Sequence, residues 1–134
     1  MRERMSLQAV VAIASLVPII IGGQGVVRGA AMFRFVAAPA SLDSHFRYLS
    51  GIFLMLGLAF ASTIPAIERQ GSRFRLLGAM VVTGGLARAL SWVAVGPPGP
   101  GHRFGLVMEL VVVPLLMLWQ TRVARICAGG QSSR

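Results

Sequence analysis

Four long apolar stretches alternate with short polar segments along the sequence. A helix needs about 20 apolar residues, rising about 1.5 Å each, to cross a bilayer core of about 30 Å. Helices can satisfy their own backbone hydrogen bonds inside lipid. The predicted spans are residues 5–27, 44–67, 74–95 and 102–126, followed by a short tail at 127–134. The pattern predicts an all-α, polytopic membrane protein, in which all 134 residues form a single integral membrane domain folded as a four-helix bundle.

The segments between these stretches carry turn signals. Residues 96–101 read GPPGPG, which predicts a tight turn that is not helical, and residues 68–73 form a short polar loop. Asp43 or Ser44 is a suitable N-cap for the second helix. Residues 29–42 are longer and amphipathic, so both an interfacial helix and a re-entrant loop remain open.

The composition fits lipid better than water as the main solvent. The protein is 55% hydrophobic and 13% charged, whereas soluble domains carry about 25% charged residues. Its formal net charge is +9, and all 13 basic residues are arginines that fall in small groups between apolar runs. This distribution suits membrane orientation, so we expect no nucleic-acid partner. The abundance of Arg, Ala, Gly, Val and Pro suggests a GC-rich bacterial genome, hence a multi-pass protein of the bacterial cytoplasmic (inner) membrane.

Arginine placement also predicts the orientation. Positive charge favours the cytoplasmic side. With the N-terminus inside, the inner segments would hold eight arginines and the outer segments four. The inner set is Arg2, Arg4, Arg69, Arg73, Arg75, Arg122, Arg125 and Arg134, and the outer set is Arg28, Arg34, Arg47 and Arg103. We therefore expect both termini in the cytoplasm.

Arg88 is the only fixed charge between Leu76 and His102, and it needs an explanation. It lies seven residues before Val95, and Glu109 lies seven residues after His102, on the other side of the predicted turn. Both would lie about 10 Å below the outer boundary on antiparallel neighbours. A lone arginine at this depth costs about 2.5–3.5 kcal/mol on insertion scales. We expect the two residues to pair, although a protonated, unpaired Glu109 remains an alternative.

Other polar residues are predicted at or above the same depth. Asp43 and Arg47 are spaced i, i+4 and can pair on one helix face. Together with Arg88 and Glu109 they predict an outer polar cluster, completed by His45, Gln24, Ser91 and Tyr48. The inner half of the bundle is almost wholly apolar. Such a cluster can form a ligand pocket that opens outward, or it can serve only to lock the helices.

No complete catalytic or metal-binding motif is present, so we assign no catalytic residue, metal or cofactor. Asp43, Glu109, His45 and His102 have suitable types for a metal, but their spacing matches no ligand pattern. The single cysteine, Cys127, cannot form an internal disulfide. Whether the protein catalyses a reaction stays open, although the sequence favours a non-enzymatic protein.

Three stretches resemble a known family when taken together. They are HFRYLSG at residues 45–51, GGLARALS at residues 84–91 and ELVVVPLLMLWQ at residues 109–120. With them, the sequence resembles the bacterial small membrane proteins of domain of unknown function 4345 over about residues 5–126. The resemblance implies four transmembrane helices and no particular activity. Its pattern includes Arg47, Arg88 and Glu109.

Two functional hypotheses follow. The first is an accessory or structural subunit of a membrane complex, with membrane lipids and other membrane subunits as partners, and with lipid or another amphiphile bound at the outer polar cluster. The second is a small membrane enzyme or transporter for a small lipophilic anion. In that case Arg88 and Arg47 would hold the acid group and Glu109 would move a proton.

Overall fold

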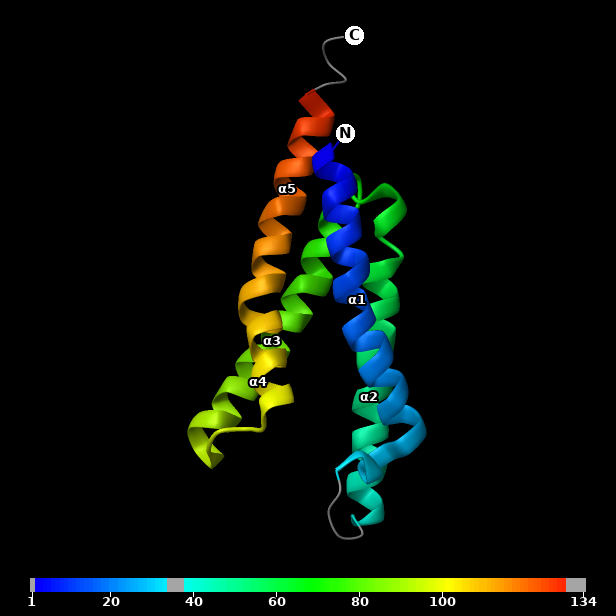
Figure 1. Cartoon of the computed structure of the whole chain (residues 1–134), viewed down its shortest axis with the longest axis vertical. Coiled ribbons are helices and arrows are strands. Elements are labelled where there is room, and N and C mark those ends of the chain that lie inside the picture. The colour runs from blue at the N-terminus through cyan, green and yellow to red at the C-terminus, as the bar shows by residue number, and fades with distance from the viewer. Residues whose placement is uncertain (1, 34–37, 130–134) are drawn as a thin grey trace. The chain divides into compact units, whose positions relative to one another are not determined.

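Helices make up almost all of the computed structural model, which describes residues 2–33 and 38–129 (Figure 1). The elements are α1 Arg2–Arg28, η1 Gly29–Met32, α2 Ala40–Ala61, η2 Ile64–Ala66, α3 Gly71–Val95, α4 Pro100–Val107, η3 Met108–Val112 and α5 Val113–Gly129. Four segments are long and apolar enough to cross a membrane: Arg2–Met32, Ala40–Ala66, Gly71–Val95 and Pro100–Gly129. The described residues are therefore all-α, and their spans indicate a multi-pass membrane protein.

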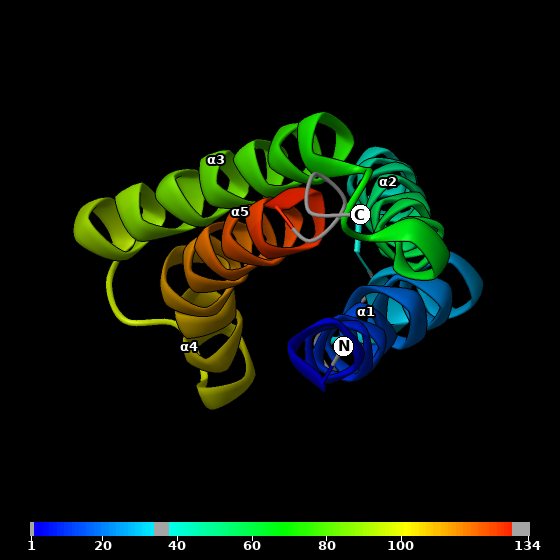
Figure 2. The same cartoon turned by 90° about the horizontal axis from the view of Figure 1, so that it is seen from above.

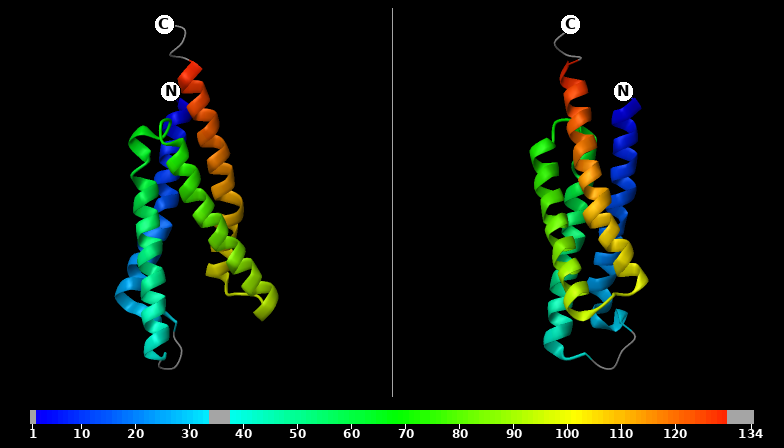
Figure 3. Two further views of the ribbon diagram at one scale, coloured as in Figure 1. Left: turned by 180° about the vertical axis from the view of Figure 1, so that it is seen from behind. Right: turned by 90° about the vertical axis from the view of Figure 1, so that its left-hand side faces the viewer.

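The protein folds into two compact units. The α1–α2 unit comprises Gln8–Ile64, and the α3–α5 unit comprises Met1–Leu7 together with Pro65–Arg134. Within the first unit, α1 and α2 run side by side (Figure 3). Their backbones approach closely at glycines on both helices. A Cβ at Gly22 would lie 2.6 Å from the backbone nitrogen of Leu54, and one at Gly57 would lie 2.8 Å from Cγ1 of Ile19.

Within the α3–α5 unit, α3 packs lengthwise against α5 (Figure 2). Glycines recur at every seventh position along the contacting face of α3: Gly71, Gly78 and Gly85. A Cβ at Gly78 would lie 2.8 Å from Cγ of Met117, and one at Gly85 would lie 2.8 Å from Cβ of Glu109. Small residues at a helix interface let backbones approach in a membrane, where packing rather than the hydrophobic effect drives association.

The fourth span is not a uniform α-helix, because Met108–Val112 is π-helical. The backbone N–H of Val113 donates to the carbonyl of Met108 rather than to the one four residues back. Pro114 follows directly; it has no N–H for the Leu110 carbonyl, and its ring would clash with that carbonyl in a regular α-helix. A π-segment is one of the ways in which a helix absorbs such a residue.

The second helix differs from its predicted bounds at both ends. It begins at Ala40, so neither Asp43 nor Ser44 is the N-cap; Pro39 holds that position with φ −53°. Proline has a fixed φ and no N–H, so it is tolerated where a helix starts. The helix ends at Ala61 rather than near Ile67. Pro65 has no N–H to donate to the Ala61 carbonyl, so the α-helix cannot continue through it.

The predicted loops are also shorter than the sequence indicated. Helix α3 already begins at Gly71, inside the expected polar loop. Helix α4 begins at Pro100, so only residues 96–99 of the GPPGPG stretch are non-helical, and Gly96 takes a φ of +121°. Of residues 29–42, the first four form η1 and 40–42 belong to α2, whereas 34–37 lie outside the described residues.

Candidate functional site

Arg88 of α3 and Glu109 of the π-segment form a bidentate ion pair. Nε of Arg88 donates to Oε2 of Glu109 at 3.0 Å, and Nη2 donates to Oε1 at 3.0 Å. The Glu109 side chain is 10% exposed and that of Arg88 is 33% exposed. The pairing expected from their spacing around the turn is therefore present. Both carboxylate oxygens are used, while Nη1 of Arg88 has no hydrogen-bond partner within the described residues.

Glycines on both helices make room for this pair. A Cβ at Gly85, one turn before Arg88, would meet the Cβ of Glu109. A Cβ at Gly105 would lie 3.8 Å from Oε1 of Glu109 and 3.9 Å from Cζ of Arg88, which is ordinary contact distance. Gly85 therefore sets the close helix approach, and Gly105 leaves the charged groups partly uncovered on the α4 side.

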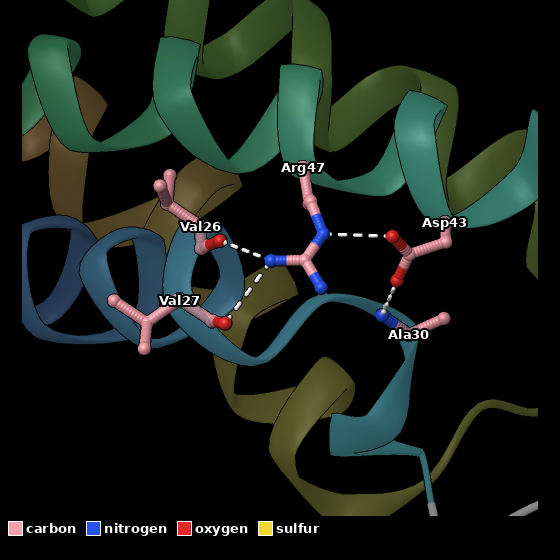
Figure 4. A network of polar contacts seen from close by, with 5 residues as sticks. All are labelled: Val26, Val27, Ala30, Asp43 and Arg47. Carbon is pink, nitrogen blue, oxygen red and sulfur yellow. Dashed lines mark hydrogen bonds and ion pairs between the residues drawn. The ribbon is translucent and has the colours of Figure 1, made fainter. Parts of the chain in front are cut away.

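A second polar network lies in the α1–α2 unit, centred on Arg47 (Figure 4). Its Nε donates to Oδ2 of Asp43 at 2.7 Å, and its Nη1 donates to the carbonyls of Val26 and Val27 at 2.7 and 3.0 Å. Asp43 in turn accepts the backbone N–H of Ala30 at 2.7 Å. These contacts place a cation on the last carbonyls of α1, where the helix dipole is negative.

Gly29 completes this second network by its conformation. Its φ is +57°, a left-handed conformation that favours glycine at the end of a helix. A Cβ there would also collide with Asp43 and with the Arg47 guanidinium. The network therefore caps the C-terminal end of α1 with side-chain groups and ties it to the start of α2.

The other predicted cluster residues make fewer contacts. His45, Tyr48, Gln24 and Ser91 are all exposed. Ser91 belongs to the same unit as the Arg88–Glu109 pair, whereas the other three belong to the α1–α2 unit with Asp43 and Arg47. Each unit thus has its own polar network, and a single cluster drawn from both stays a prediction. Among the described residues, no group of three or more metal-ligand side chains gathers.

The sequence interpretation missed a third polar network, at the opposite end of the α3–α5 unit. Arg4 pairs with Glu68 at 2.9 Å, and Arg122 pairs with Glu3 at 3.0 Å. Gln120, whose exposed fraction is 0%, donates through Nε2 to the carbonyl of Ile67 at 2.8 Å. Of these polar residues only Gln120 and Arg122 lie inside a predicted span, so the almost wholly apolar inner half stays a prediction. Glu3 and Glu68 flank the apolar stretches and Gln120 lies inside one, but nothing in the local sequence indicates their partners.

Comparison with known proteins gives one match. Neither the curated proteins nor the solved structures include a match to this protein. The sequence pattern of a family described as domain of unknown function (DUF4345) matches residues 6–120. The matched region includes Arg47, Arg88 and Glu109, and it runs from the first turns of α1 into α5. The protein belongs to the DUF4345 family, whose defining domain has no known function.

Proposed function

We propose that the protein is a non-catalytic accessory or structural subunit of a membrane complex. It lies in the cytoplasmic membrane of a bacterium as a four-helix bundle with both termini in the cytoplasm. Its outer polar residues contact lipid or another amphiphile. The observation that carries the proposal is the bidentate Arg88–Glu109 pair, because the protein itself neutralises these two charges, which it places well inside two spans.

The geometry of the pair favours architecture over acid–base chemistry. A general base needs a free oxygen within reach of the proton that it removes. Both oxygens of Glu109 instead accept from Arg88, and the Glu109 side chain is 10% exposed. Arg47 is similarly engaged by Asp43 and by two backbone carbonyls. Charges that the protein pairs in this way can hold helices in register.

The layout of the spans supports a subunit rather than a self-contained enzyme. Within the described ranges, the segments that join the spans are short, and none is long enough to fold as a separate domain. The spans expose many large apolar side chains on several helices, among them Ile13, Met55, Leu90 and Leu118. Such surfaces are covered either by lipid tails or by the spans of other subunits.

Mass spectrometry of everything that co-purifies with the native protein in a lipid nanodisc tests this proposal. We expect one or more larger membrane proteins in a fixed stoichiometric ratio. An Arg88→Gln variant should give lower expression or stability, because Glu109 would lose its partner. Purified protein that carries out a turnover without partners would overturn the proposal.

One observation favours a second candidate, a small membrane enzyme or transporter for a lipophilic anion. Nη1 of Arg88 has no partner within the described residues, and the side chain is 33% exposed. The π-segment at Glu109 also supports this second candidate, because π-segments are frequent at functional sites. In that case an Arg88→Gln variant would fold normally but would no longer retain a lipophilic anion that the wild-type protein carries through purification.

A further inference from the structure

One end of the α3–α5 unit carries a concentration of arginines. This is the end at which α1 and α3 begin and at which α5 ends (Figure 3). We call it the arginine end. Its exposed arginines are Arg2, Arg69, Arg73, Arg75, Arg122 and Arg125.

Contacts within the unit bring these segments together. The Arg4–Glu68 pair joins the start of α1 to the turn before α3, and the Arg122–Glu3 pair joins α1 to α5. The Gln120 amide donates to the Ile67 carbonyl and so joins α5 to the same turn. Arginines that are far apart in the sequence therefore lie at the same end of the unit.

The protein does not neutralise this surface. Its described carboxylates, Glu3 and Glu68, are already paired with Arg122 and Arg4. Within the arginine end, the arginines with no ion pair among the described residues are Arg2, Arg69, Arg73, Arg75 and Arg125. No acidic residue lies in the first turn of α3, where the helix dipole is positive. The surface therefore has an unbalanced positive charge.

The arginine end also coincides with the ends of candidate membrane spans. The candidate span of α3 runs from Gly71 to Val95, so Arg73 and Arg75 lie within its first turns. Side chains on a helix lean toward its N-terminus, which directs these two guanidinium groups out of the hydrocarbon. Trp119, half-buried on α5 one turn before Arg122, is a residue type enriched at this depth. We therefore expect the unpaired cations to lie at the level of the lipid headgroups.

We propose that the arginine end binds anionic phospholipid headgroups. Guanidinium matches the two free oxygens of a phosphate diester with parallel hydrogen bonds, and all the cations at this surface are arginines. Anionic lipids attract basic groups beside a span, and the attraction falls off within a Debye length. The inference adds a site to the proposed function and does not depend on it, because it needs only the spans and the unpaired arginines.

Lipid titration of the purified protein in detergent tests the inference. Phosphatidylglycerol and phosphatidylcholine are compared as probes, and bound lipid is counted by native mass spectrometry. We expect the wild-type protein to prefer phosphatidylglycerol. A variant with Arg73→Gln and Arg75→Gln should bind phosphatidylglycerol at least about tenfold more weakly, because each arginine near a surface contributes measurably to anionic-lipid binding. Both side chains are exposed, so the variant should fold.

The matched control is a variant with Arg28→Gln and Arg103→Gln, which removes the same amount of charge outside the arginine end. We expect its affinity for phosphatidylglycerol to stay within about twofold of wild type. Equal loss in the control variant would reduce the effect to net charge and overturn the inference. So would equal binding of the two lipids, or an unchanged affinity in the first variant. Inorganic phosphate that displaces the lipid at comparable concentration would overturn it by assigning the site to free phosphate. Polyglutamate that binds more tightly than lipid would overturn it by assigning the site to an acidic protein.

Discussion

Glu109 and Arg88 contact each other through two hydrogen bonds, and neither charge has another described partner of opposite sign. Loss of one member of such a pair leaves a charge inside the protein with nothing to balance it. Gly85 also shapes the site, because the Cβ of Glu109 lies 2.8 Å from the position that a Cβ at Gly85 would take. At the scale of single residues, the close approach of α3 to Glu109 therefore depends on the absence of a side chain at Gly85.

Two neighbouring glycines allow a matched test of this dependence. Gly85→Ala should destabilise the protein by about 1–3 kcal/mol, because the new Cβ would lie 2.8 Å from both Cβ of Glu109 and Cδ2 of Leu110. Gly84→Ala should be neutral or slightly stabilising, because nothing lies within 4 Å of its Cβ and alanine favours helix. The free energy of unfolding, measured by denaturing-detergent titration, checks both. Equal effects of the two substitutions would contradict the close approach at Gly85.

At the scale of elements, sequence patterns predicted some features and not others. The four spans follow from apolar length, and the Arg88–Glu109 pair follows from equal spacing on either side of a turn. The π-segment was not predicted, because a helix can absorb a proline by a kink or by a π-segment. Which of these forms depends on how the neighbouring helices pack against it. The contacts of Gln120 and Glu3 were missed because they join residues 53 and 119 positions apart. The sequence carries no local signal for either contact.

The π-segment should be necessary for the orientation of the Glu109 side chain toward Arg88. In a Pro114→Ala variant we expect the segment to return to α-helix, which would rotate Glu109 by about 100° relative to the rest of α5. The coupling free energy between Arg88 and Glu109, from a double-mutant cycle in this background, should then fall below about 0.5 kcal/mol. Leu115→Ala, at an exposed position of the same helix, is the control. An undiminished coupling after the proline is removed would show that Pro114 does not set the geometry.

At the scale of the whole molecule, charge is distributed unevenly between the ends of the spans. Eight of the 13 arginines lie at the start of α1, between α2 and the first turns of α3, or from the last turns of α5 onward. This distribution predicts that both termini are cytoplasmic. Orientation also decides which leaflet the arginine end would meet. The single native cysteine makes this measurable by labelling.

Orientation can be read from one engineered thiol. In a Cys127→Ser, Ser133→Cys variant, a membrane-impermeant maleimide should label inverted membrane vesicles and leave intact spheroplasts unlabelled. A Cys127→Ser, Pro97→Cys variant should show the opposite pattern, because Pro97 is exposed in the α3–α4 connection. Labelling of the tail thiol in intact spheroplasts would place the C-terminus outside.

The central claim is that the charges inside the spans hold the helices together, and exchanging one pair tests it most directly. Arg88→Glu and Glu109→Arg should each cost about 3–5 kcal/mol, because each change puts two like charges side by side in a poorly hydrated position. The double variant should recover most of that stability, measured by the same detergent titration. A double variant no more stable than the single variants would contradict the claim.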